Sequence, residues 1–142
     1  MPQQTDSALR TRLCRIADRD VQEKVRVAGR VLYYEAKSAM LTLIDGHQGL
    51  LVDTSLALDS QSHLWASERL STVIVIGRID KVQKALKLPP KPSTMSYLHI
   101  YPRLVLRAIL IVPSPELDLE MWNSVLEEEE REHEDVSTSA TT

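Results

Sequence analysis

Seven basic side chains lie between residues 78 and 107 of this chain, and a single carboxylate, that of Asp80, lies among them. Amines and guanidinium groups at this density neutralise phosphates and release the counterions condensed on a polyanion. The segment therefore predicts binding of a polyanion rather than the making or breaking of bonds. The seven residues are Arg78, Lys81, Lys84, Lys87, Lys91, Arg103 and Arg107.

Tyrosines accompany these cations. Tyr97 and Tyr101 lie within the basic segment, and Tyr33 and Tyr34 lie close to another cation, Lys37. Aromatic rings beside cations are typical of sites that stack the bases of single-stranded nucleic acid. The alternative is a solvated lysine-rich loop whose tyrosines pack on the body of the protein. The predicted DNA-binding residues are Tyr33, Tyr34, Lys37, Arg78, Lys81, Lys84, Lys87, Lys91, Tyr97, Tyr101 and Arg103.

No set of residues has the spacing of a catalytic centre. Catalysis needs a nucleophile with a base, a pair of carboxylates or a metal, and the four histidines, at positions 47, 63, 99 and 133, are dispersed. The four glycines are isolated and form no phosphate loop, and the single cysteine, Cys14, excludes a disulfide framework or a Cys-rich zinc site. We expect no enzyme activity, no cofactor, no metal and no small-molecule substrate.

Charge is divided unevenly along the chain. The 142 residues have a net charge of −3, yet residues 116–135 alone carry ten carboxylates and one arginine, so the preceding part is basic. This asymmetry also indicates a polyanionic partner for the basic part. No apolar run approaches the roughly 18 residues of a membrane span, and the first 20 residues lack an apolar signal segment. We therefore expect an intracellular protein with no membrane partner.

The elements that position these residues begin with a strand pattern that occurs twice. Residues 25–31 and 73–79 both place apolar, mostly β-branched side chains at alternate positions, and each run contains a glycine. A glycine inside a strand marks a bulge or a tight bend, and strongly bent strands favour a small closed barrel. Asp45-Gly46 supplies a hairpin turn. Five strands are predicted, at residues 25–34, 39–44, 49–54, 72–82 and 104–112.

These strands predict an all-β fold of the OB type, a five-stranded Greek-key barrel over residues 21–113. The polar residues 57–70 are expected to hold one or two helical turns between the third and fourth strands. An SH3-like barrel is the alternative, but it would not explain the long connection before the last strand. In an OB-fold that connection and the one after the first strand grip oligonucleotides. The last strand alternates Leu104, Leu106, Ala108, Leu110 and Val112.

After Pro113 the apolar period changes from 2 to 3.6, which predicts a C-terminal helix over residues 114–131, capped by Ser114. Its apolar side chains spread over more than one narrow face, so we expect a partner helix to cover part of it. Residues 132–142 are expected to be a disordered tail, and residues 1–20 an N-terminal extension with a short helix. The predicted partner-binding residues are Leu117, Leu119, Met121, Trp122, Val125 and Leu126.

The order and spacing of several motifs resemble a known family. They span residues 24–31, 41–43, 50–56, 73–77 and 106–110, and end on Leu117-Asp118-Leu119 and Trp122. Across about residues 24–131 the chain resembles the Ten subunit of the CST telomere-capping complex. The smallest subunit of replication protein A is a close second resemblance, because it shares the glycine-marked strands and the helix after a Leu-Asp-Leu-like step.

The resemblance implies an OB-fold that forms a heterodimer with the Stn subunit, largely through the C-terminal helix and a barrel face. It implies a complex that also contains the large CST subunit, holds single-stranded telomeric DNA and lies in the nucleus, at the telomeric region of chromosomes. A protein-binding adaptor without DNA contact is the remaining interpretation. Two features depart from the family pattern: the long connection before the last strand, and the acidic tail.

Overall fold

The structure, a computed structural model, describes residues 7–57 and 70–140, and for residues 133–140 it describes the backbone alone. The helical turns predicted in residues 57–70 therefore fall almost entirely outside the described residues. The elements are β1 (Leu9–Arg10), the 3₁₀ helix η1 (Leu13–Asp18), β2 (Lys24–Glu35), β3 (Met40–Asp45), β4 (Gln48–Asp53), β5 (Thr72–Lys81), the 3₁₀ helix η2 (Ser93–Met95), β6 (His99–Pro113) and α2 (Leu119–Ala140).

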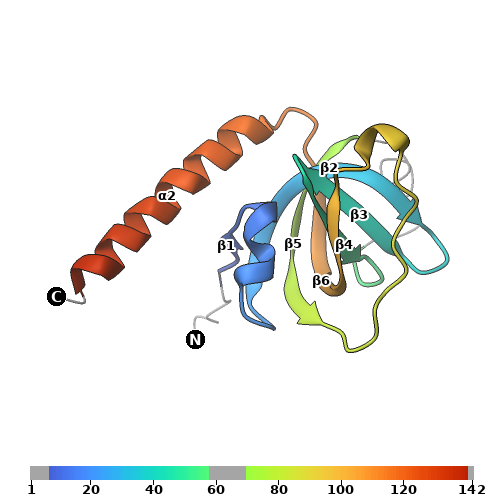
Figure 1. Cartoon of the computed structure of the whole chain (residues 1–142), viewed down its shortest axis with the longest axis horizontal. Helices are drawn as coiled ribbons and strands as arrows, with labels where there is room; N and C mark the ends of the chain where they lie inside the picture. Colours follow the sequence, from blue (N-terminus) through green and yellow to red (C-terminus); the bar gives the residue numbers. More distant parts are fainter. Residues whose placement is uncertain (1–6, 58–69, 141–142) are drawn as a thin grey trace, which may run out of the picture.

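Five of the described strands close a barrel (Figure 1). β2 pairs with β3, β3 with β4, β4 with β6 and β6 with β5, and β5 returns to β2 to complete the ring. Only the β4–β6 pair within this ring is parallel. The alternating apolar side chains of the repeated pattern fill the interior, where Val25, Val27, Val73 and Val75 are fully buried. The predicted OB-fold is confirmed.

One extra residue in β6 forms a bulge beside Gly77. Leu110 lies opposite Ile76, whereas Ala108 lies opposite Gly77, so Ile109 has no counterpart across the pair. The β6 backbone lies so close that a β-carbon at Gly77 would overlap it. The bulge predicted from this glycine is confirmed, whereas the β2–β5 register at the matching glycine of β2 is regular.

The bulge reverses the alternation of β6 beyond Ala108, because one inserted residue moves every later side chain to the other face. Ile111 is buried, whereas Leu110 is 49% exposed and Val112 is 41% exposed. The predicted alternation is therefore correct as far as Ala108 and wrong beyond it. The second half of β6 consequently presents apolar side chains to solvent.

The N-terminal extension adds to the edge of β2. β1 runs parallel to β2, with Leu9 opposite Val25, where β2 has no pairing with β3. The short helix expected in residues 1–20 is the 3₁₀ helix η1, which buries Leu13 and Ile16 against the barrel. Leu9, which shares the helical spacing of these two residues, lies in β1 instead.

Helix α2 begins and ends later than its sequence pattern indicates. The carboxylate of Asp118 accepts the backbone N–H of Met121 at 3.1 Å, which makes Asp118 the cap, whereas the hydroxyl of Ser114 bonds to the carbonyl oxygen of Val112. The helix continues to Ala140 rather than ending at residue 131. No glycine or proline follows Pro115, and glutamate and arginine favour helix, so nothing local stops it. None of the described helices is long and apolar enough to cross a membrane.

Candidate nucleic-acid interface and partner-binding helix

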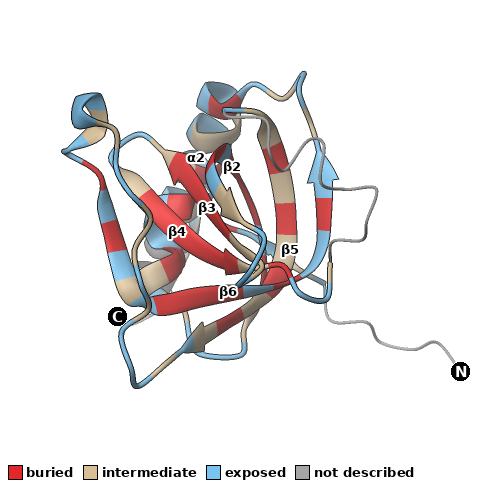
Figure 2. Ribbon diagram, turned by 90° about the vertical axis from the view of Figure 1, so that its right-hand side faces the viewer, coloured by how far each residue is buried: buried red, intermediate tan, exposed pale blue. Residues whose placement is uncertain are grey.

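The β5–β6 connection, residues 82–98, lies against the outer face of β3 and β4 (Figures 1 and 2). Near β5, Leu86 and Leu88 pack with Leu51 of β4. Near β6, Leu98 packs with Ile44 of β3, together with Met95 of η2. Although it contains three prolines, this connection is anchored at both of its ends.

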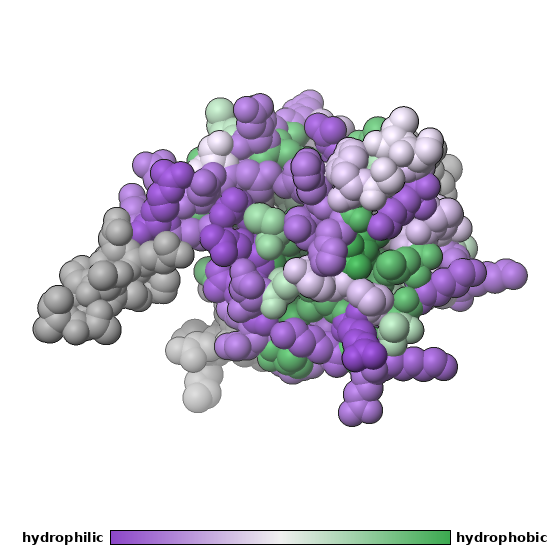
Figure 3. Space-filling model, in the orientation of Figure 1, coloured by the Kyte–Doolittle hydropathy of each residue, from purple (hydrophilic) through white to green (hydrophobic). Residues whose placement is uncertain are grey.

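The cations predicted to bind DNA are spread over the barrel. Lys81, Lys84 and Lys87 are exposed at the start of the connection, and long hydrophilic side chains project from this part of the molecule in Figure 3. Arg103 is exposed on β6, and its carbonyl oxygen accepts the backbone N–H of Val82 at 2.9 Å. The fold therefore brings Arg103 beside the first part of the connection.

The other three predicted cations lie elsewhere. The Nζ of Lys91 donates to the carbonyl oxygen of Leu98 at 2.7 Å and so helps to hold the connection together. Arg78 donates to the carbonyl oxygen of Gln22 at 3.0 Å. Lys37 is exposed in the turn between β2 and β3. Lys91 and Arg78 therefore have structural contacts of their own.

The four tyrosines have different surroundings. Tyr97 is 54% exposed and Tyr101 is 42% exposed. Tyr33 is 38% exposed and lies opposite Thr42 of β3, on the outer side of the barrel. Tyr34 is half-buried and packs against the barrel core.

Two histidines join the exposed tyrosines. The rings of His47 and Tyr97 lie 5.0 Å apart at 50°, and the rings of His99 and Tyr101 lie 4.4 Å apart at 89°. The backbone N–H of His99 donates to the carbonyl oxygen of His47 at 2.9 Å, which brings the two pairs together. These four residues form what we call the aromatic row. Sequence reasoning missed both histidines: His47 reaches the row only through β4–β6 pairing, whereas His99 lies between Tyr97 and Tyr101 in the sequence, where its alternate spacing could have indicated it.

Arg107 is held by two carboxylates on neighbouring strands. Its Nη1 lies 2.6 Å from Oδ2 of Asp53, and its Nε lies 2.8 Å from Oδ2 of Asp80. The hydrogen bond to Asp80 raises the pKa of Arg107 and outweighs the partial burial of the guanidinium, which acts to lower it. Burial acts to raise the pKa of Asp53, but hydrogen bonds from Ser55 and the Arg107 guanidinium outweigh it and lower that pKa. Arg107 thus joins β4, β5 and β6.

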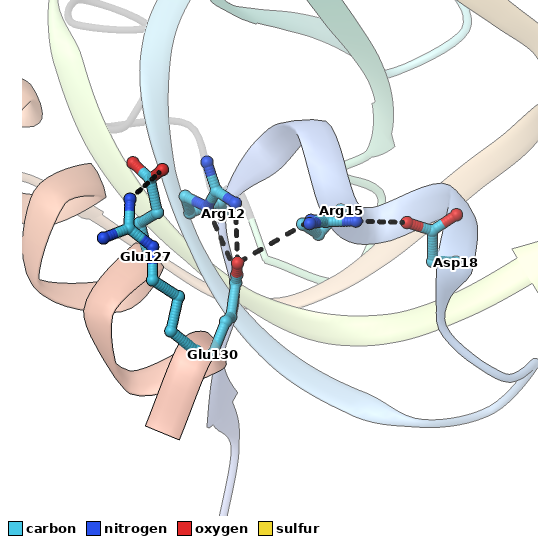
Figure 4. Close-up of polar contacts among 6 residues, drawn as sticks. Arg12, Arg15, Asp18, Glu127 and Glu130 are labelled. Atoms are coloured by element: carbon cyan, nitrogen blue, oxygen red, sulfur yellow. Dashed lines mark hydrogen bonds and ion pairs between the residues drawn. The ribbon is translucent and has the colours of Figure 1, made fainter. Parts of the chain in front are cut away.

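Helix α2 is fastened to the N-terminal extension by Glu130 (Figure 4). The Arg12 guanidinium donates to both Glu130 oxygens, at 3.2 and 2.6 Å, and Nε of Arg15 lies 3.7 Å from Oε2 of the same carboxylate. The hydrogen bond to Glu130 raises the pKa of Arg12. Nearer the start of the helix, the amide of Asn123 donates to Asp45 at 2.6 Å. These contacts define the docked face of α2.

Five of the six predicted partner-binding residues divide between the two sides of α2, whereas the half-buried Leu117 precedes the helix. Leu119 and Leu126 are buried, and Trp122 is half-buried, with an Nε1 that has no hydrogen-bond partner among the described residues. Met121 is 64% exposed and Val125 is 44% exposed. These two apolar residues, one helical turn apart, lie on the side of the helix that the described residues leave exposed.

The exposed end of β6 adds a second apolar surface. Leu110 and Val112 lie opposite Ile76 and Ile74 of β5, so the four side chains share the outer face of the barrel. Sequence alternation assigned Leu110 and Val112 to the other face because it could not place the bulge. The described residues contain no group of three or more His, Cys, Asp or Glu side chains that could hold a metal ion.

The class that this architecture defines is the OB-fold barrel with a C-terminal helix. No protein-family model and no curated protein sequence matches the chain. Among solved structures, a chain of the S. pombe Stn1–Ten1 complex matches with a TM-score of 0.64 and 19% identity, over 92% of this chain and 98% of that one. The S. pombe telomere capping protein Ten1 matches with a TM-score of 0.60 and 19% identity, over 88% and 99%.

A putative aspartyl-tRNA synthetase from Leishmania major also matches, with a TM-score of 0.52 and 16% identity. It covers 83% of this chain but only 23% of the synthetase chain. Likeness at these identities establishes a shared fold. With the synthetase that fold is one part of a much longer chain, whereas with the Ten1 structures it extends over nearly the whole of both chains.

Proposed function

We propose that this chain is a Ten-type subunit of a telomere-capping complex and that it forms a heterodimer with an Stn-type OB-fold subunit. The observation that carries the proposal is the nearly complete mutual coverage with a chain of the S. pombe Stn1–Ten1 complex, 92% and 98%. In the synthetase, by contrast, the matching barrel is one part of a longer protein, and most of that chain is left uncovered. The resemblance of the sequence motifs to the same family supports the proposal independently of the fold.

The partner surface in this proposal combines Met121 and Val125 of α2 with Leu110 and Val112 of β6. All four are apolar and more than 40% exposed, which is the composition expected of a surface that a partner covers. Leu126 and Leu119 support this surface from the docked side of the helix instead of contacting the partner. The partner-binding role predicted for the helix thus concentrates on its exposed side.

Co-expression with the Stn-type subunit of the same organism tests the proposal. Met121→Glu with Val125→Glu places two charges in the apolar surface, and we expect at least about 30-fold weaker association, since central interface anchors are commonly worth about 2 kcal/mol or more. Glu120→Lys is the matched control, because it changes the helix charge by two units on another exposed side and should leave association unchanged. Association of the double variant at the affinity of the unmodified chain would contradict the proposal.

The rest of the proposal follows from membership of such a complex. The protein acts in the nucleus, at the telomeric region of chromosomes, together with the large CST subunit, and helps the complex hold single-stranded DNA without catalysing a reaction. The identity of the partner that co-purifies from cells separates this role from that of the smallest replication protein A subunit. A partner from the general replication factor would replace the telomeric assignment with that one.

A further inference from the structure

The face on which OB-folds hold oligonucleotides is filled by this chain itself. That face lies on the second and third barrel strands, here β3 and β4. Their outward side chains are almost inaccessible, because Thr42 and Leu51 are each 2% exposed and Ile44 is 7% exposed. A β-carbon built on Gly49 of β4 would lie 2.6 Å from Cγ1 of Ile100, so not even a methyl group fits between the strand and its cover.

The aromatic row, His47, Tyr97, His99 and Tyr101, lies on the outside of this cover. On β6 the exposed residues His99, Tyr101 and Arg103 alternate with Ile100, which is buried. The pairing of β6 with β4 is irregular between Ile100 and Val105, and within this stretch Arg103 adds an exposed cation two residues after Tyr101. The rings touch one another in pairs, and a base that stacks there meets side chains that are already ordered.

Cations accompany the row on one side. The backbone bond from Val82 to Arg103 places Lys81, the last residue of β5, beside the Arg103 end of the row. The carboxylates on the neighbouring strands, Asp53 and Asp80, are engaged by Arg107. Exposed rings for the bases and exposed cations for the phosphates thus lie on neighbouring segments, which is the combination that binds single strands.

We propose that this chain contacts single-stranded DNA along the aromatic row and Arg103, and not on the outer face of β3 and β4. The proposal deepens the function given above and rests on its single-strand role. It includes His47 and His99 as base-contacting residues beside the two tyrosines. Tyr33, which adjoins the filled face at Thr42, has no part in it.

Fluorescence anisotropy of the full chain with a labelled oligothymidylate, at several salt concentrations, tests this assignment. Tyr101→Ala should weaken binding by between about 5-fold and about 150-fold, the range for one stacked base, with an unchanged salt dependence because the ring carries no charge. Arg103→Ala should weaken binding and also flatten the slope of log K against log salt by about 0.7. Tyr33→Ala is the matched control and should bind as the unmodified chain does.

The outcomes separate the sites and the two proposals. Loss on Tyr33→Ala together with full binding by Tyr101→Ala would overturn the assignment in favour of the β3–β4 face. Absence of binding by the unmodified chain would overturn it as well, while association with the Stn-type partner, which uses α2 and the end of β6, would still be measured separately. Both tyrosines are exposed, so their removal should leave the core intact. A melting curve of each variant checks this, and an unchanged melting temperature excludes loss of fold as the cause of weaker binding.

Discussion

Gly77→Ala tests whether the bulge of β6 depends on the close approach of two backbones. A β-carbon at Gly77 would meet the carbonyl oxygen of Arg107, would lie 2.9 Å from the carbonyl carbon of that residue, and would lie 3.0 Å from the Cα of Ala108. All three atoms belong to the backbone, so no side chain can turn away to make room. The strands must separate locally, or the bulge must move.

The expected cost follows from two opposing effects. Overpacking a well-packed site costs about 1–3 kcal/mol. Alanine restricts the unfolded chain more than glycine does, which returns roughly 0.4–1 kcal/mol of stability. Because all the clashing atoms are backbone, we place the overpacking cost in the upper half of its range, about 2–3 kcal/mol, and expect Gly77→Ala to lower the free energy of unfolding by about 1–2.6 kcal/mol. At this chain length the melting temperature should fall by about 4 °C for each kcal/mol, hence by about 4–10 °C.

Urea and thermal unfolding, followed by circular dichroism, measure this change, and Gly29→Ala is the matched control. Gly29 occupies the same place in the repeated strand pattern, but the nearest atom to its added β-carbon is Cδ1 of the Leu13 side chain, at 3.1 Å. That side-chain end can shift by a few tenths of an ångström, and the nearest backbone atom, the carbonyl oxygen of Ile44, lies 3.3 Å away, so the control should lose clearly less stability. Equal losses in both variants, or a Gly77→Ala chain as stable as the unmodified one, would refute the reasoning.

Two further predictions concern ion pairs. Arg12→Ala removes both hydrogen bonds to Glu130 and should reduce the free energy of urea unfolding by about 1–2 kcal/mol. Arg131→Ala is the control: it loses an exposed i,i+4 ion pair and should reduce the same free energy by only about 0.3–0.5 kcal/mol. Equal reductions would contradict the role given to Glu130. The pKa of Asp53 is lowered from 3.8 on folding, so its carboxylate contributes stability above about pH 4 that is lost as the pH falls through the folded-state pKa. Asp53→Asn should therefore flatten the acid side of the stability profile, and a profile identical to that of the unmodified chain would disprove this contribution.

The barrel could be predicted from the sequence because its strands carry local signals. β-branched residues at every second position define one buried face, and the turn at Asp45-Gly46 joins two strands, with Gly46 at a φ of +60° as such a turn requires. These signals depend on residues close together in the chain. The all-β class, the five barrel strands and the C-terminal helix are therefore predictable from the sequence alone.

Which residues face a ligand or a partner was decided only by the tertiary structure. The sequence shows that Gly77 marks a bulge, but not that the extra residue is Ile109, and this single residue determines that Leu110 and Val112 face solvent. Likewise, His47 reaches Tyr97 only because β4 pairs with β6. Composition determines that cations and rings are present, whereas strand register and long-range packing determine which of them lie together, because these depend on residues far apart in the chain.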